Sequence, residues 1–134
     1  MFIRLSILII LMLLSSGCAK SRYSWNGYDD KLYGYYKTPA ESDRFMEALQ
    51  EIIQEAEVEG RIPPGIYAEY GYMLYERGRF ADAVIWYRKE LEKWPESRLL
   101  MEKMIALAEK RRLMIDSKNE LKNQTIEVKK EKAP

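Results

Sequence analysis

The stretch from Pro64 to Ser97 places the strongest constraint on how this chain can fold. Gly78 divides it into two segments, and Pro95 closes it. Glycine readily adopts the left-handed conformation that ends a helix, and proline cannot continue one. Large apolar or small residues recur at helical spacing, as Tyr67, Tyr70 and Leu74 in the first segment and Ala83, Tyr87 and Leu91 in the second. The stretch therefore predicts two antiparallel helices joined by a tight turn.

Small residues stand where these two predicted helices would touch. Gly71 lies in the first and Ala83 in the second, so the backbones can approach closely while aromatic rings fill the space beside them. With these residues the stretch resembles the tetratricopeptide repeat, whose signature is W-x2-L-G-x2-Y, then A-x3-F, then P. The positions that match this signature are Tyr67, Tyr70, Gly71, Leu74, Ala83, Tyr87 and Pro95. The alternative to a repeat is an amphipathic hairpin without repeat ancestry.

A weaker copy of this unit precedes it. When the sequence is aligned with itself at an offset of one repeat, Tyr33 aligns with Tyr67 and Tyr36 with Tyr70. This preceding segment therefore resembles a degenerate first repeat. Thr38-Pro39-Ala40-Glu41 has the form of a capping box with proline at the first helical position. The helix expected after it ends at Gly60 and presents one apolar face, made of Phe45, Leu49, Ile52, Ile53 and Ala56.

A further helix is expected after Pro95. Ser97 is placed to cap it, and its basic end at Lys110-Arg111-Arg112 complements the helix dipole. Its inward residues are expected to be Leu100, Met101, Met104, Ile105 and Ala108. The sequence therefore predicts an all-α domain over residues 38–115, built of tetratricopeptide-like antiparallel hairpins with about four helices. The polar segment 116–134 lacks the apolar residues needed to offset ordering and is predicted to be disordered.

The N-terminus has the pattern of a secretory signal over residues 1–17. Arg4 precedes an apolar run from Leu5 to Leu14, which is shorter than the roughly 20 residues that span a bilayer. Ser15-Ser16-Gly17-Cys18 resembles the bacterial lipoprotein cleavage box, although Ser15 stands where that box usually has leucine. The resemblance implies a diacylglycerol and an acyl chain on Cys18, and Ala19 after it implies the periplasmic face of the outer membrane. An ordinary signal peptide is the alternative.

An aromatic arm is expected at residues 18–37, following the lipid site. Its segment YSWNGYDDKLYGYY concentrates tyrosines and one tryptophan, and these rings must cover some surface. They are predicted mainly to cap the helical domain, with one or two rings left outside. Docking of a partner protein through Trp25 and Tyr28, or stacking on cell-wall glycan, are the alternatives.

Composition argues against several functions. The 134 residues carry 22 Lys+Arg against 21 Asp+Glu, so no net basic face points to nucleic acid. Histidine is absent, which removes the commonest general base and metal ligand, and Cys18 is the single cysteine. The sequence contains no recognisable catalytic constellation. We therefore expect a non-enzymatic protein with no cofactor besides its covalent lipid, no metal and no small-molecule substrate.

The repeat resemblance implies where a partner would bind. Tetratricopeptide proteins commonly hold a peptide or helix on the concave face lined by the first helix of each repeat. The corresponding positions are Ala68, Tyr72, Tyr75 and Glu76 in the hairpin, with Glu102 and Ala106 in the last helix.

The pieces YSWNGYDDKLYGYY, PPGIYAEYGYMLYERG and AVIWYRKELEKWPESRLLMEKMI together resemble a bacterial lipoprotein family known as domain of unknown function 4810. Its members are typically encoded beside a lipoprotein similar to the curli export channel. The resemblance implies a scaffold, or an accessory or assembly subunit, of an outer-membrane complex whose partners are other envelope proteins. A peptidoglycan- or glycan-binding module and a self-assembling structural lipoprotein are the alternatives.

Overall fold

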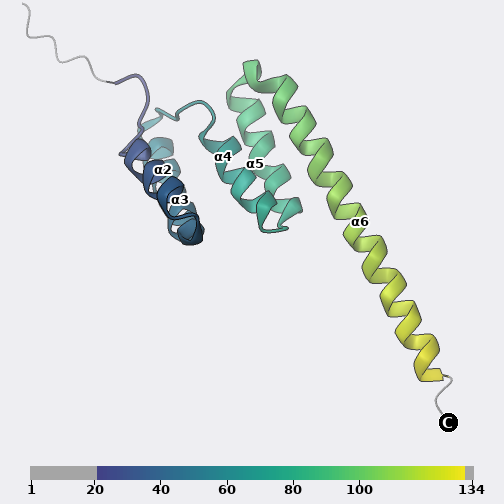
Figure 1. Cartoon of the computed structure of the whole chain (residues 1–134). Coiled ribbons are helices and arrows are strands. Elements are labelled where there is room, and N and C mark those ends of the chain that lie inside the picture. The colour runs from purple at the N-terminus through teal and green to yellow at the C-terminus, as the bar shows by residue number, and fades with distance from the viewer. Residues whose placement is uncertain (1–20, 132–134) are drawn as a thin grey trace, which may run out of the picture.

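The computed structural model describes residues 21–131, and every regular element in that range is helical. The all-α prediction is therefore confirmed. Two helical hairpins stand side by side, and a long last helix packs on the second and extends past it (Figure 1). In chain order the elements are α2 (Tyr28–Lys37), η1 (Pro39–Glu41), α3 (Ser42–Glu59), α4 (Ile66–Glu76), α5 (Phe80–Lys93), η2 (Pro95–Ser97) and α6 (Arg98–Glu131).

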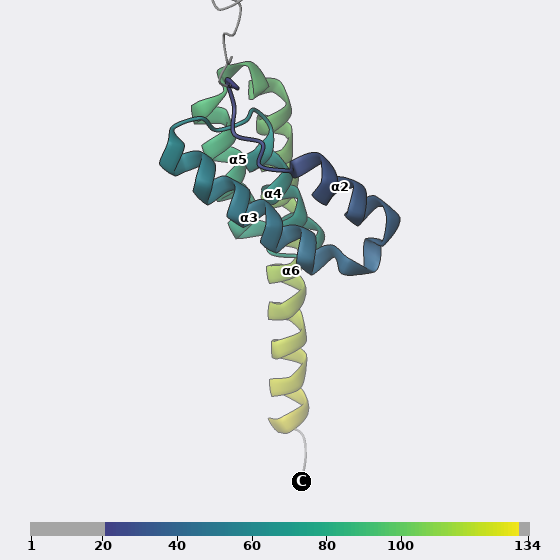
Figure 2. The ribbon, with the colours of Figure 1, turned by 90° about the vertical axis from the view of Figure 1, so that its left-hand side faces the viewer.

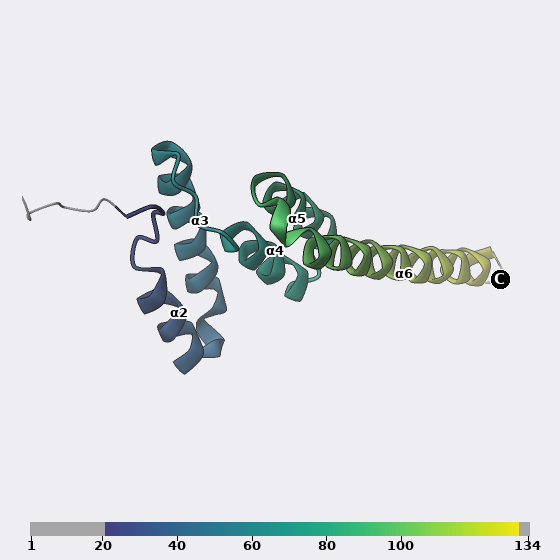
Figure 3. The ribbon, with the colours of Figure 1, turned by 90° about the horizontal axis from the view of Figure 1, so that it is seen from above.

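The helices follow one another across the molecule in the order of the chain. Seen from above, the α2–α3 hairpin lies at one end, α4 and α5 lie in the middle, and α6 lies at the other end (Figure 3). Helix α4 contacts α3 and α5, and α6 contacts α5. Each hairpin thus packs on its sequence neighbour, and the α2–α3 end is far from α6.

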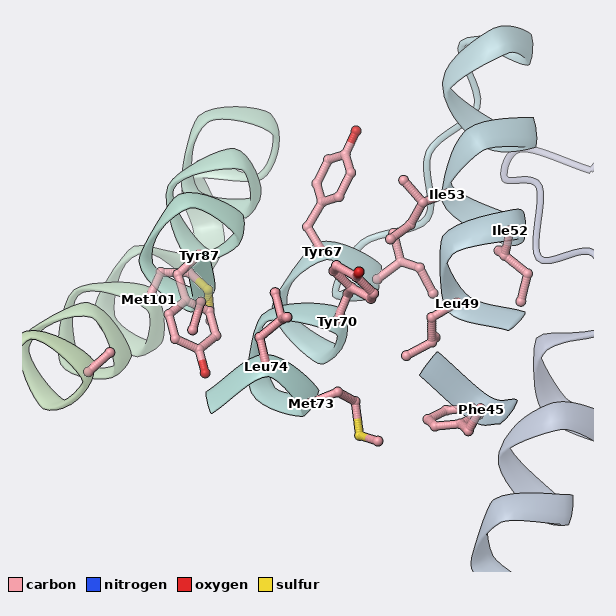
Figure 4. Close-up of a cluster of buried hydrophobic side chains, with 13 residues drawn as sticks. Phe45, Leu49, Ile52, Ile53, Tyr67, Tyr70, Met73, Leu74, Tyr87 and Met101 are labelled. Carbon is pink, nitrogen blue, oxygen red and sulfur yellow. The ribbon is translucent and has the colours of Figure 1, made fainter. Parts of the chain in front are cut away.

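The core lies on both sides of α4 (Figure 4). Leu49 and Ile53 of α3 face Tyr70 on one side, and Tyr87 of α5 packs toward Leu74 on the other. All five side chains are at most 3% exposed. Met101 and Ala108 of α6 close the core beyond Tyr87, so one continuous apolar cluster joins α3, α4, α5 and α6.

The closest helix contact occurs at Gly71. A Cβ atom at this position would lie 2.8 Å from Cε1 of Tyr87 and 3.2 Å from Cβ of Trp86. Glycine therefore leaves the space that the Tyr87 ring occupies, and Ala83 is fully buried in the same contact region. The turn behind the contact has Gly78 at φ 73°, in the left-handed conformation expected from the sequence.

A buried carboxylate ties α5 to the start of α4. Glu90 is 2% exposed, and its Oε1 accepts the backbone N–H of Gly65 at 2.7 Å. Gly65 is the N-cap residue of α4 at φ 89°, so its own side chain supplies no cap. Burial raises the pKa of Glu90, although backbone N–H groups of Gly65, Ala68 and Tyr67 oppose that rise. Glu90 of one helix therefore serves as the N-terminal cap of another.

The segment before α2 lies against the C-terminal ends of α3 and α5. The backbone N–H of Ser24 donates to the carbonyl of Arg61 at 2.8 Å, and the Ser24 hydroxyl donates to the Glu59 carboxylate. The Tyr23 ring meets Trp94 edge to face, with centroids 5.6 Å apart. Tyr33 and Tyr36 point outward, at 58% and 78% exposure. The arm thus packs on the helices at its start, and Trp25, at 38% exposure, is exposed together with Tyr33 and Tyr36.

Four local predictions are wrong. The capping box fails because Thr38 makes no side-chain cap bond; residues Pro39–Glu41 form a 3-10 turn, and α3 starts at Ser42. The exposed Tyr33 and Tyr36 do not occupy the buried positions of Tyr67 and Tyr70, so the register of the degenerate repeat does not hold. Leu100 is 58% exposed rather than inward. Ser97 does not cap α6 as expected, because its hydroxyl donates to the Trp94 carbonyl, 2.7 Å away.

The predicted end of the last helix at Lys110-Arg111-Arg112 is also wrong, and so is the predicted disorder over residues 116–131. Residues 132–134 of the predicted disordered segment lie outside the described residues. Helix α6 continues without interruption to Glu131. Neither glycine nor proline occurs between Pro95 and Pro134, and lysine, glutamate, leucine and glutamine are good helix formers. The segment's low apolar content therefore leaves it exposed rather than unfolded.

Replacing Gly71 with alanine is expected to destabilise the fold by about 1–3 kcal/mol, because the new methyl group overlaps the Tyr87 ring. Gly34→Ala is the matched control, since a Cβ there meets nothing within 4 Å in the middle of α2. That control should leave stability unchanged or raise it by up to about 1 kcal/mol. Urea denaturation followed by circular dichroism measures both, and equal stabilities for the two variants would contradict the contact.

The raised pKa of Glu90 makes stability depend on pH. Between its ordinary value of 4.5 and its raised value, the folded state keeps a proton that the unfolded state has released. Stability should therefore fall as pH rises through that window. Glu90→Gln should reduce the slope, whereas Glu92→Gln on the exposed side of α5 should not. Urea midpoints between about pH 4.5 and pH 7 test this, and an unchanged slope in Glu90→Gln would exclude Glu90 as its source.

Candidate functional site

Helix α4 has one side that faces neither α3 nor α5. Glu69, Tyr72 and Glu76 recur at spacings of three and four residues and therefore share this side. Opposite them, Tyr67, Tyr70 and Leu74 are buried in the core. The sequence sets this arrangement because the apolar stripe of α4 fixes which way the remaining residues point.

The start of α2 joins this side of α4. The Tyr28 hydroxyl donates a hydrogen bond to the Glu69 carboxylate, and the Tyr28 ring lies 5.2 Å from that of Trp25. Burial raises the pKa of Tyr28, and its Glu69 partner raises it further. Burial also raises the pKa of Glu69, partly offset by the hydrogen bond from Tyr28. The predicted arm residues and the predicted α4 residues therefore meet on one surface.

We call this surface the tyrosine face. Tyr72, 47% exposed, is its most accessible α4 ring, while Trp25 is 38% exposed. The charge of Glu76 is the main reason why the pKa of Tyr72 is raised. The tyrosine face is made of Trp25, Tyr28, Glu69, Tyr72, Tyr75 and Glu76.

Two of the predicted binding residues lie at the edge of this face. Tyr75 is half-buried and packs edge to face on Phe80, with centroids 5.1 Å apart. Ala68 is half-buried and packs against the core cluster. Both belong as much to the α4–α5 packing as to the surface, so their substitution would perturb the fold as well.

Glu102 does not join the tyrosine face. It lies on α6, which packs on α5, and it precedes Glu109 by seven residues on the same side of that helix. Glu109 pairs with Arg88 of α5 at 3.4 Å. Ala106, predicted beside Glu102, is exposed on α6 as well. The predicted concave surface joining α4 to the last helix is therefore not assembled by these residues.

Glu69 and Tyr35 belong to this part of the molecule but were not predicted as site residues from the sequence. Tyr35 stacks on Phe45 with centroids 4.8 Å apart, and its phenol contributes to the raised pKa of Tyr72. The spacing of Glu69, Tyr72 and Glu76 along one helix side was the signal that would have identified the glutamate. No comparable signal marks Tyr35, because its position depends on how α2 crosses the neighbouring hairpin.

This face offers chemistry for recognition. It combines flat aromatic rings with carboxylates, and such rings are frequent at the centres of protein interfaces. Among residues 21–131 no group of three or more acidic or cysteine side chains could hold a metal ion. Within the same range, no helix combines the length and the apolar character required to cross a membrane. Cys18, the predicted lipidation site, lies outside the described residues.

Residues 21–131 thus form an all-helical architecture in which the tyrosine face exposes aromatic rings beside carboxylates. The model of a protein family, described as Domain of unknown function (DUF4810), matches residues 22–104, and the chain belongs to this family. That range covers α2 to α5 and the start of α6. It therefore includes every residue of the tyrosine face. No curated protein matches the chain, and no solved structure matches it either.

Tyr28→Phe should raise the pKa of Glu69 further, because it removes the hydrogen bond that holds this pKa down. Tyr33→Phe is the matched control on the same helix, since Tyr33 is 58% exposed. NMR titration of the glutamate side chains measures the change. An unaltered Glu69 titration in Tyr28→Phe would show that the hydroxyl does not join α2 to α4.

Proposed function

We propose that this protein is a lipid-anchored scaffold or accessory subunit that binds another envelope protein through the tyrosine face. The observation that carries the proposal is the exposure of Tyr72 beside Glu76 on a helix whose other side is fully buried. A ring held at the surface by a packed core loses little conformational entropy on binding.

The neighbours of Tyr72 support this role. Tyr28 and Glu69 join α2 to α4 by a hydrogen bond, and Trp25 packs on Tyr28. The surface is therefore organised before any partner arrives. Its carboxylates, Glu69 and Glu76, suit a partner segment that carries lysine or arginine beside apolar residues.

The membrane part of the proposal depends on the N-terminal pattern. The apolar run before Ser15-Ser16-Gly17-Cys18 resembles a lipoprotein signal, with Cys18 as the acylated residue and Ala19 favouring the outer membrane. Two or more acyl chains anchor a protein stably. A partner in this setting is another envelope protein, such as a lipoprotein similar to the curli export channel.

A second candidate is binding of cell-wall glycan through the arm. Tyr33 and Tyr36 on α2 are 58% and 78% exposed, so their rings are free to stack on sugars. Co-sedimentation with purified peptidoglycan tests this function, and Tyr33→Ala with Tyr36→Ala should abolish it.

Cross-linked affinity purification from native membranes, read by mass spectrometry, tests the scaffold function. Tyr72→Ala should reduce recovery of the partner by about tenfold or more, as expected for an aromatic interface residue. Tyr36→Ala is the matched control, because this ring is exposed but lies outside the tyrosine face. Cys18→Ser should move the chain from the membrane fraction to the soluble fraction.

Two outcomes would contradict the proposal. Equal partner recovery with Tyr72→Ala and with the unaltered chain would exclude the tyrosine face as the binding surface. A Cys18→Ser chain that stays in the membrane fraction would exclude the lipid anchor. Circular dichroism of each variant separates loss of binding from loss of folding.

A further inference from the structure

Charge is divided unequally between the two ends of the molecule. Residues 21–97 contain 15 acidic and 10 basic side chains, whereas α6 contains 9 basic and 6 acidic residues. The body therefore carries a net negative charge, and the last helix carries a net positive one. Within the body, α2 and α3 lie at the end away from α6, whereas α5 packs on α6 (Figures 1 and 3).

The outer part of α6 has an unpartnered side. The last part of α6 extends past the other helices, and no other helix of residues 21–131 lies beside its end (Figure 1). Arg112, Ile115 and Asp116 still line a small pocket with the start of α5. On the outward side of α6, Met114 and Leu121 are 54% and 64% exposed, and Lys118 and Lys122 share this side of the helix. This basic and apolar surface, which we call the α6 tip, is defined by Met114, Lys118, Leu121 and Lys122.

The opposite end of the molecule contains a groove between α2 and α3. The two helices that form it are nearest the viewer in Figure 2, with α6 behind them. The groove has a volume of about 620 Å³ and is lined in part by Tyr35, Phe45 and Ala48. We call it the α2–α3 groove.

The charged lining of this groove is acidic. Arg44 pairs with Glu41 at 3.4 Å, so these two lining charges offset each other. Of the remaining charged lining residues, Asp30, Glu47 and Glu51 are acidic and one, Lys31, is basic. Within residues 21–131, neither Glu47 nor Glu51 forms an ion pair. The groove therefore offers an apolar floor and unpaired carboxylates.

We propose that the α6 tip of one molecule binds in the α2–α3 groove of a second copy. The tip supplies two apolar side chains and two lysines on one side of a helix, and the groove supplies an apolar floor and carboxylates. An amphipathic helix lying in a groove is a recurrent form of protein recognition. This contact goes beyond the proposed function, because it uses neither Tyr72 nor the tyrosine face.

The geometry of this contact sets the form of the assembly. The two surfaces differ and lie at opposite ends of the molecule, so the contact is head-to-tail rather than two-fold symmetric. Each bound copy leaves one groove and one tip free. Chains of molecules can therefore grow until they close into a ring or end on another partner.

Charge complementarity favours a second copy over an anionic lipid surface. A bilayer would match the lysines of the α6 tip but would leave the carboxylates of Glu47 and Glu51 unused. A second copy matches both surfaces. Contacts of this kind weaken as salt shortens the range of electrostatic attraction, from about 30 Å at 0.01 M to about 3 Å at 1 M.

Sedimentation velocity of the purified chain in detergent, with the lipid anchor retained, tests the proposal. Species larger than a dimer should form at low salt and dissociate at high salt. Lys118→Glu with Lys122→Glu should raise the dissociation constant about tenfold or more, and so should Glu47→Lys with Glu51→Lys. Mixing these two variants should restore association, because each altered surface then meets an oppositely charged one.

Glu92→Lys with Glu96→Lys is the matched control for Glu47→Lys with Glu51→Lys. Both pairs change the net charge equally, but Glu92 and Glu96 are exposed positions outside the groove. The control should associate as the unaltered chain does. A monomer at every concentration and salt condition would overturn the proposal, and so would variant mixtures that do not associate. Binding to anionic vesicles that requires Lys118 and Lys122 but not Glu47 and Glu51 would assign the α6 tip to lipid instead.

Discussion

The packing of Tyr87 against Gly71 is the contact on which the rest of the structure depends. The Tyr87 ring is fully buried and occupies the space that a side chain at residue 71 would fill. It thereby sets the distance between α4 and α5, and Met101 of α6 closes over the same region. Because α3 packs on the other side of α4, any shift at this contact changes the position of both ends of the molecule relative to each other.

The core of the hairpin was predictable because its signals are local. The spacing of Tyr67, Tyr70 and Leu74 defines the buried side of α4, and Gly78 adopts the left-handed backbone that ends the turn. An apolar stripe also identified the buried side of α3. Such signals depend on residues one or two turns apart, which the sequence displays directly.

What the sequence did not predict depends on contacts between distant segments. Glu90 caps a helix whose N-cap residue, Gly65, lies 25 residues earlier in the chain, and Glu69 meets Tyr28 across 41 residues. Neither pairing leaves a periodic pattern. The helical continuation of α6 past Asp116 has another reason: low apolar content predicts disorder, but the absence of glycine and proline and the high helix propensity of the segment favour a helix. The placement of Glu102 away from Tyr72 depends likewise on α6 packing on α5 rather than on α4.

The segment at Tyr23 and Ser24 has a mechanical consequence. Its ring contact with Trp94 and its backbone bond to Arg61 fasten the chain before α2 begins. A pull applied to the chain ahead of residue 21 would load the ends of α3 and α5 first, and α2 would stay unloaded until those contacts broke. Tension in the preceding segment therefore does not reach the tyrosine face until the contacts of Tyr23 and Ser24 have broken.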